Sequence, residues 1–155
     1  MNFKDFYNLF LENENAGFGP VYHGGKWDGI SPIKMGRGAL GTGAYFTPNK
    51  ELAIRYATES GSNVTEAYLN VKNPLKINSF HDTKIHPCVQ ALELLGMSKE
   101  KANKLVEKVE EEKGYLGKEI SSRAIPQGYD SIFFYSKGVL REIVIWNSAQ
   151  VINKS

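Results

Sequence analysis

The stretch from residue 41 to residue 57 constrains the fold most, because it joins a glycine turn, a short apolar run and a helix start. Gly41 and Gly43 have no side chain, so the backbone there can turn sharply or approach a ligand closely. The apolar run 44–46 is typical of a buried strand. Thr47 and the proline after it predict a helix start, with the hydroxyl as N-cap and proline in the first turn.

The helix predicted after this proline has an apolar face. Leu52, Ala53 and Tyr56 recur along it at helical spacing. The unit is therefore a glycine turn, a strand and a helix, with Tyr45 on the strand and Tyr56 on the helix. Both tyrosines could also be ordinary core residues, so this unit does not identify a function by itself.

Length and composition predict one globular domain that spans residues 1–155. The chain is 41% hydrophobic and 23% charged, which are ordinary values for such a domain. Its net charge of +2 is too small to indicate a nucleic-acid partner. The single cysteine, Cys88, excludes an internal disulfide and favours a reducing compartment. No apolar stretch reaches the about 20 residues of a membrane span. Residues 1–10 carry charges and no unbroken apolar run, so no signal peptide is expected. A monomer is expected, without a membrane partner.

The N-terminal segment 1–19 is predicted to be an amphipathic helix over residues 2–14, followed by a polar loop. Its apolar residues fall at steps of three and four: Phe3, Phe6, Tyr7, Phe10 and Leu11. Packing against the core is the first interpretation of this stripe. A docking or packaging segment is the alternative.

Alternating and aromatic runs predict strands in the rest of the chain, with a helical insertion over residues 81–117. In the insertion, Ser98 can cap a helix whose apolar stripe includes Ala102 and Val106. The predicted strands cover residues 20–24, 64–71, 75–77, 129–135, 142–146 and 149–152.

Two histidines and the cysteine, His81, His86 and Cys88, raise the question of a metal site. No fourth ligand stands at zinc spacing, and there is no second cysteine. We therefore predict that the chain holds no metal.

Two further residues stand where a reaction could use them. His23 ends a predicted strand, immediately before Gly24 and Gly25. Glu142 opens an otherwise apolar predicted strand. Alone, each has an ordinary explanation: a histidine at a strand end, and a charge at the solvent end of a strand.

Taken in chain order, three segments resemble the ADP-ribosyltransferase superfamily of the His-Tyr-Glu kind, which includes the poly(ADP-ribose) polymerases and the diphtheria-toxin-like transferases. These segments are Val21-Tyr-His-Gly-Gly25, Gly43-Ala-Tyr-Phe46 followed by Ala53-x-x-Tyr56, and Arg141-Glu-Ile-Val-Ile-Trp-Asn147. The resemblance implies an α+β fold. Two packed, mostly antiparallel sheets would surround an NAD cleft, with flanking helices.

The resemblance also implies roles for the matching residues, with NAD as co-substrate. His23 would hold the ribose on the adenosine side, and the backbone of Gly24 would bind the nicotinamide carboxamide, which needs one donor and one acceptor. Tyr45 and Tyr56 would bracket the flat, cationic nicotinamide ring. Glu142 would be the catalytic carboxylate, assisted by His23 and Tyr45. It would stabilise an oxocarbenium-like ribose in the transition state.

The glycine-punctuated loop over residues 27–40 carries two cations, Lys34 and Arg37. In the family context Arg37 or Lys34 would bind the pyrophosphate through charge-assisted hydrogen bonds. They could equally be solvated surface cations. No Gly-x-Gly-x-x-Gly follows a strand here, so a Rossmann dinucleotide site has little support.

Three positions depart from the family pattern. Ala53 replaces the serine of the polymerases, which removes a side-chain bond to the carboxamide, and Leu52 replaces a frequent lysine. Leu140 stands where arginine-modifying relatives carry Glu or Gln, which argues against arginine as the acceptor. The short loop before Glu142 leaves little room for polymer elongation, so transfer of a single ADP-ribose is expected.

The sequence thus predicts an NAD-dependent mono-ADP-ribosyltransferase with a macromolecular acceptor, protein being favoured over nucleic acid. The alternatives are an NAD glycohydrolase and a non-catalytic module that binds NAD or ADP-ribose. The complete His23, Tyr45 and Glu142 set argues against the last of these. The expected location is the cytoplasm, which would be the host cytoplasm for a phage protein. A toxin of a toxin–antitoxin pair and a secreted effector also stay open.

Overall fold

The computed structural model describes residues 2, 4 and 17–152. The helix predicted over residues 2–14 and most of the 1–19 segment lie outside the described residues, so both stay predictions. Within the described part, no helix is long and apolar enough to cross a membrane.

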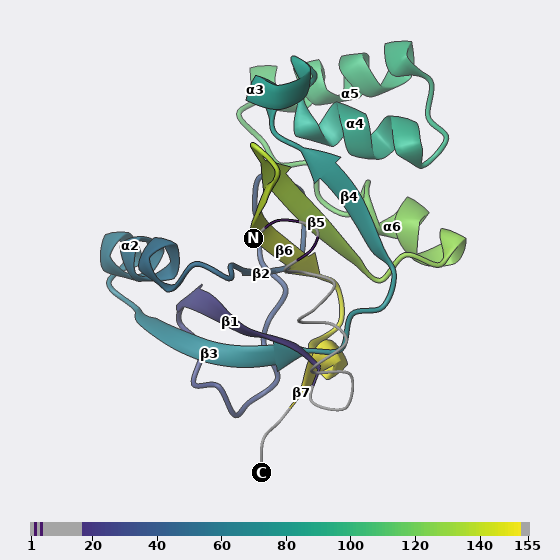
Figure 1. The fold of residues 1–155 in the computed structure, drawn as a ribbon. Helices are drawn as coiled ribbons and strands as arrows, with labels where there is room; N and C mark the ends of the chain where they lie inside the picture. Colours follow the sequence, from purple (N-terminus) through teal and green to yellow (C-terminus); the bar gives the residue numbers. More distant parts are fainter. Residues whose placement is uncertain (1, 3, 5–16, 153–155) are drawn as a thin grey trace.

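The strands of the described chain form two sheets (Figure 1). The three-stranded sheet has the order β1–β3–β7, with β1 at Phe18–Gly25, β3 at Asn63–Leu69 and β7 at Val151–Ile152. The four-stranded sheet has the order β2–β6–β5–β4, with β2 at Ala44–Phe46, β6 at Val139–Ile145, β5 at Ser131–Ser136 and β4 at Pro74–Asn78. The pair β4 and β5 is parallel, and the other pairs are antiparallel. The predicted α+β fold with two mostly antiparallel sheets is confirmed.

The helices lie at opposite ends of this arrangement (Figure 1). The first, α2, covers Lys50–Ser60 and lies beside β1 and β3. The helices of the predicted insertion gather next to β4: α3 at Phe80–Thr83, α4 at Pro87–Leu94 and α5 at Lys99–Glu111. Ser98 caps α5 as predicted, because its side chain accepts a hydrogen bond from the backbone N–H of Lys101. Shorter elements follow: α6 at Ser121–Ala124, η1 at Ile125–Gln127 and η2 at Ser148–Gln150.

Two apolar clusters form the core, one on each face of the four-stranded sheet. The first lies between this sheet and the insertion helices and includes Ile132 and Val144. The second lies between the two sheets and includes Phe133 and Ile143. Because both faces of β5 and β6 are covered, these strands are apolar on both sides. The two charged residues within them, Arg141 and Glu142, are therefore exceptional.

The predicted helix start at Thr47 is wrong by two residues. The N-cap of α2 is Asn49, whose side chain accepts from the backbone N–H of Leu52 at 3.2 Å. The backbone of Thr47 instead exchanges two hydrogen bonds with Tyr22, at 2.8 and 2.9 Å. This pairing holds Thr47 extended, so the helix begins only after the next proline. Sequence alone did not show the partner in β1.

The prediction that Glu142 opens its strand is also wrong. Lys137 and Gly138 have φ angles of 52° and 74° and form a two-residue turn between β5 and β6. Such a turn joins antiparallel strands directly. As a result β6 begins at Val139, and Glu142 lies in its middle.

The last predicted strand, over residues 149–152, is shorter than expected. Residues 148–150 form η2, which Asn147 caps through a hydrogen bond from the backbone N–H of Ala149. Only Val151–Ile152 pair as β7, at the edge of the three-stranded sheet.

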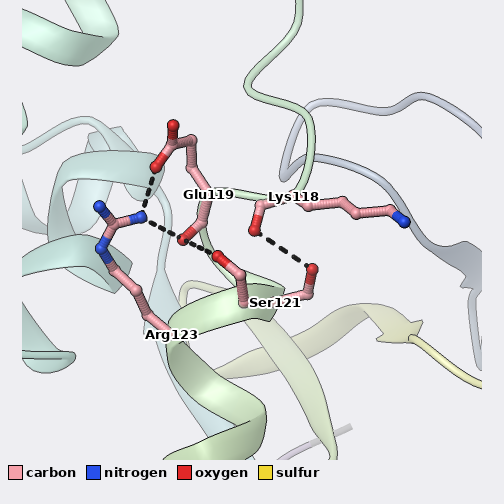
Figure 2. Close-up of polar contacts among 5 residues, drawn as sticks. Lys118, Glu119, Ser121 and Arg123 are labelled. Carbon is pink, nitrogen blue, oxygen red and sulfur yellow. Dashed lines mark hydrogen bonds and ion pairs between the residues drawn. The ribbon is translucent and has the colours of Figure 1, made fainter.

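A turn after α5 fixes the end of the insertion (Figure 2). Arg123 forms an ion pair with the carboxylate of Glu119 and donates a hydrogen bond to its backbone carbonyl at 2.8 Å. Just before this turn, the carbonyl of Gly117 accepts from the backbone N–H of Thr42 at 2.8 Å. The insertion is thereby tied to the glycine turn that precedes β2.

Candidate active site

One cleft of about 500 Å³ brings the predicted site residues together. They come from β1, the loop after it, β2, α2 and β6. Residues far apart in the sequence thus share one space, although this arrangement does not test their roles. The lining includes all six: His23, Gly24, Arg37, Tyr45, Tyr56 and Glu142.

His23 is fixed by a hydrogen bond to the neighbouring sheet. Its Nδ1 lies 2.7 Å from the backbone carbonyl oxygen of Tyr45. A carbonyl can only accept, so Nδ1 carries the hydrogen and Nε2 keeps its lone pair in the neutral ring. The rings of Trp27 and Phe46 lie 5.9 and 5.5 Å from the imidazole and hold its orientation. Nε2 can therefore accept a hydrogen bond from a ligand hydroxyl.

Tyr45 is locked by the glycine-rich loop. Its hydroxyl donates to the carbonyl of Gly41 at 2.6 Å and accepts from the backbone N–H of Leu40 at 2.9 Å. Burial raises the pKa of Tyr45, so the phenol stays neutral. A Cβ on Gly38 would lie 2.2 Å from Cζ of Tyr45, so only glycine lets the loop cover this ring. With its hydroxyl occupied, Tyr45 offers its ring to the cleft.

Tyr56 differs from Tyr45 in its exposure. It lies on α2 with 46% of its surface exposed, and it lines the same cleft. Burial raises the pKa of the Tyr56 hydroxyl, and the negative charge of Glu142 adds to this effect. Tyr56 thus presents a neutral aromatic ring within electrostatic reach of Glu142.

Gly24 is where α2 approaches β1. A Cβ on Gly24 would lie 2.3 Å from the backbone carbonyl oxygen of Ala53. Packing of the helix therefore requires glycine at this position, whatever ligand its backbone binds. The role predicted for Gly24 at the carboxamide stays a prediction.

Glu142 owes its direction to a bulge in β6. Glu142 pairs with Phe134, but Leu140 pairs with Tyr135, so Arg141 is an extra residue without a partner in the register. Side chains two residues apart normally share a face of the sheet. Here Leu140 packs between the two sheets, whereas Glu142 faces the helical side together with Phe134.

The carboxylate of Glu142 has no hydrogen-bond or ion-pair partner among the described residues. Burial raises the pKa of Glu142 to about 7, because burial removes the water that would stabilise the ionised form. A carboxylate that is poorly solvated and uncompensated in a cleft is ready to receive a positive charge or a hydroxyl donor.

Comparison with known proteins identifies the family. A family model described as "ADP-Ribosyltransferase in polyvalent proteins" matches residues 15–155. The chain belongs to this family. One solved structure, titled "Crystal structure of an anti-CRISPR protein", is 15% identical with a TM-score of 0.38, over 84% of this chain and 90% of that one. No curated protein matches the sequence. ADP-ribosyltransferase domains use NAD as a substrate.

Two of the residues that depart from the transferase pattern, Ala53 and Leu140, are buried away from the cleft. Ala53 is fully buried on α2, where the helix meets β1, and not on the surface of the cleft. Leu140 is buried between the sheets, so a carboxylate at that position would point away from the cleft. The bulge at Arg141 thus turns position 140 away from Glu142 and the cleft.

Arg37 and Lys34 both line the cleft. The guanidinium carbon of Arg37 lies 5.5 Å from the ring centroid of Tyr115, at the end of the insertion. Binding of the pyrophosphate by either cation stays a prediction.

Sequence reasoning missed three residues around the site: Trp27, Gly38 and Tyr115. Trp27 orients the imidazole of His23, and Gly38 lies against Tyr45. The glycine pattern of the loop marked Gly38, although its partner ring was not evident. Nothing in the sequence connects Tyr115 with Arg37, because 77 residues separate them and the contact exists only in the folded chain.

The described residues contain no group of three or more metal-ligating side chains. His86 instead lies 3.1 Å from a carboxylate oxygen of Glu110. The thiol of Cys88 donates to the carbonyl of Ala39 at 3.1 Å.

Proposed function

We propose that the chain is an NAD-dependent mono-ADP-ribosyltransferase that moves ADP-ribose to a protein acceptor. The observation that carries the proposal is the position of Glu142. This uncompensated carboxylate lines the same cleft as His23 and the exposed ring of Tyr56. We call this cleft of about 500 Å³ the donor cleft.

The residues of the donor cleft fit the chemical groups of NAD. Nε2 of His23 accepts a hydrogen bond from a ribose hydroxyl, because Nδ1 is used by the Tyr45 carbonyl. The rings of Tyr45 and Tyr56 attract the cationic nicotinamide ring by stacking and cation–π interaction. Arg37 or Lys34 pairs with the pyrophosphate.

Glu142 acts on the bond between C1′ of the ribose and the nicotinamide nitrogen. As this bond breaks, its electron pair goes to the nicotinamide ring, and positive charge develops on the ribose. The carboxylate stabilises this charge and accepts a hydrogen bond from the 2′-hydroxyl. Because the charge is larger in the transition state than in the substrate, the interaction accelerates the reaction.

Two features support transfer of one ADP-ribose to a protein. The connection between β5 and β6 is the two-residue turn of Lys137 and Gly138, which leaves no long loop to bind a growing polymer. The net charge of +2 gives no strong attraction to a nucleic acid.

Incubation with labelled NAD in a cell lysate tests the proposal. We expect release of nicotinamide and label on macromolecules that is removed by protease but not by nuclease. Free labelled ADP-ribose alone would show an NAD glycohydrolase. Bound but uncleaved NAD would show a non-catalytic module, and either result would contradict the proposed transferase.

A further inference from the structure

A second cavity of about 430 Å³ adjoins the donor cleft. Gly38, Ala39 and Glu142 line both spaces. The same carboxylate is therefore reached from two directions, one through the donor cleft and one through this second space. We call the second space the insertion cavity, because residues 86–88 and 106–116 form most of its lining.

The lining of the insertion cavity is mainly apolar. Val106 and Val109 come from α5, Leu116 follows that helix, and Phe134 comes from β5 beside Glu142. Such surfaces bind a long aliphatic stem while its polar end stays near solvent or a charge.

Carboxylates supply the negative charge of this cavity. Glu110 lies at an exposed position, with Oε1 3.1 Å from Nε2 of His86, and Glu142 lies at the boundary with the donor cleft. Nδ1 of His86 accepts from the backbone N–H of Cys88 at 3.1 Å, so the imidazole donates from Nε2. Burial raises the pKa of the Cys88 thiol to about 12, so this thiol stays neutral. Among the described residues, the insertion cavity has no lysine or arginine in its lining.

We propose that the insertion cavity binds the acceptor, and that the acceptor is a protein segment presenting a lysine side chain, since Leu140 argues against arginine. This inference rests on the function proposed above. The aliphatic stem would lie against Val109 and Leu116, and Glu110 would attract the cation at the mouth. The same charges repel nucleic-acid phosphates and acceptor carboxylates.

The transfer takes place in the shared space around Glu142, and its atoms and charges balance. The bond from C1′ to nicotinamide breaks first, while Glu142 is ionised, and its electrons return to the nicotinamide ring. The acceptor nitrogen then gives one proton to the carboxylate and forms a bond to C1′ with its freed electron pair. The products are neutral nicotinamide, a cationic N-linked ADP-ribosyl side chain, and one proton that passes from Glu142 to solvent.

Short peptides test the class of acceptor directly. One lysine, one arginine or one glutamate is placed among glycines, and each peptide is incubated with the protein and labelled NAD beside a single-stranded oligonucleotide. We expect label on the lysine peptide. Label only on the arginine peptide, the glutamate peptide or the oligonucleotide would overturn the inference.

Variants of Glu110 locate the binding in the insertion cavity. Glu110→Gln should lower the ratio of peptide transfer to NAD hydrolysis about fivefold, the scale of a partly exposed ion pair. Glu110→Lys should reverse the preference toward the glutamate peptide, a gain that misfolding cannot produce. Glu111→Gln is the matched control, because Glu111 is exposed on the same helix and does not line the cavity. Equal ratios in wild type and both Glu110 variants would overturn the inference.

Peptide binding without NAD separates this inference from the proposed function. Fluorescence anisotropy of a labelled lysine peptide should show affinity that Glu110→Lys removes. Such binding by a protein that never cleaves NAD would refute the proposed function and support the insertion cavity. NAD cleavage with no Glu110-dependent peptide affinity would support the proposed function and refute the cavity as acceptor site.

Discussion

The donor cleft and the insertion cavity meet at Glu142 but are built in different ways. The donor cleft takes its residues from strands, from α2 and from the loop between β1 and β2, and it carries the cations Lys34 and Arg37. The insertion cavity is walled by helical and loop residues of the insertion, and its lining is apolar with Glu110 at the mouth. In the proposed function, the elements of the donor cleft hold the residues that bind and cleave NAD. The proposed role of the insertion is to supply a surface that selects the acceptor.

Loss of the shared carboxylate should have the largest effect. Glu142→Gln keeps the shape of the side chain but removes the charge that, in the proposed function, stabilises the ribose cation. We expect kcat for nicotinamide release to fall by about 10²–10³-fold, with little change in the Kd of NAD. Calorimetry gives the Kd, and chromatography of nicotinamide gives the rate.

The matched control for this variant is Glu66→Gln, an exposed glutamate on β3 of the other sheet. It should leave both values unchanged. Because the pKa of Glu142 is raised in the folded chain, its contribution to stability is present below about pH 4.5 and lost as the pH rises through 7. Glu142→Gln should therefore melt at a higher temperature than wild type at pH 8. A lower melting temperature there would contradict the account of the buried carboxylate.

Loss of the exposed ring of Tyr56 in the donor cleft should have the next largest effect. Tyr56→Ala removes a face for the nicotinamide ring and should weaken NAD binding about tenfold, as expected for a stacked cationic ring. Tyr56→Phe keeps the ring and should bind NAD almost as wild type does. If both variants bound NAD equally well, Tyr56 would not contact the ring.

A change at Gly38, which lines both the donor cleft and the insertion cavity, should lower the stability of the fold moderately. Gly38→Ala would place a Cβ 2.2 Å from Cζ of Tyr45, so the loop or the ring must move. We expect a loss of about 1–3 kcal/mol in the free energy of unfolding, measured by denaturant titration. Gly36→Ala is the control in the same loop, because nothing lies within 4 Å of its Cβ. Equal losses in the two variants would show that contact with Tyr45 is not the cause.

The smallest effect is expected where the two regions touch at the surface. Tyr115→Leu removes the ring under Arg37 and should raise the KM for NAD about twofold, because an exposed cation–π contact contributes little. Tyr115→Phe keeps an aromatic ring and should match wild type. A change of tenfold or more in Tyr115→Leu would mean that this contact controls the donor cleft.

Local signals in the sequence predicted much of the fold, whereas the resemblance to the ADP-ribosyltransferases predicted the six residues that line the donor cleft. Ser98 predicted the start of α5, and the run around Tyr45 predicted β2, because each signal acts within a few residues. The helix start predicted at Thr47 was wrong because the backbone of Thr47 pairs with Tyr22. Local sequence preferences do not report such a long-range contact.

The direction of Glu142 required the structure. A strict period of two would have placed Leu140 and Glu142 on one face, and the bulge at Arg141 separates them. The insertion cavity was not predicted either, since Ala39, Cys88 and Leu116 meet only after long-range packing.

The pH dependence of kcat/KM tests the central claim most directly, because it connects NAD cleavage with the ionisation of Glu142. Burial raises the pKa of Glu142 to about 7, and the proposed reaction needs the ionised carboxylate. In wild type, kcat/KM should fall about tenfold per pH unit below 7 and level off above it.

The same measurement on Glu142→Gln provides the decisive comparison. The residual rate of this variant should show no titration near pH 7. A flat wild-type profile between pH 5.5 and 8.5, or a titration that persists unchanged in the variant, would contradict the assignment of Glu142 as the catalytic carboxylate.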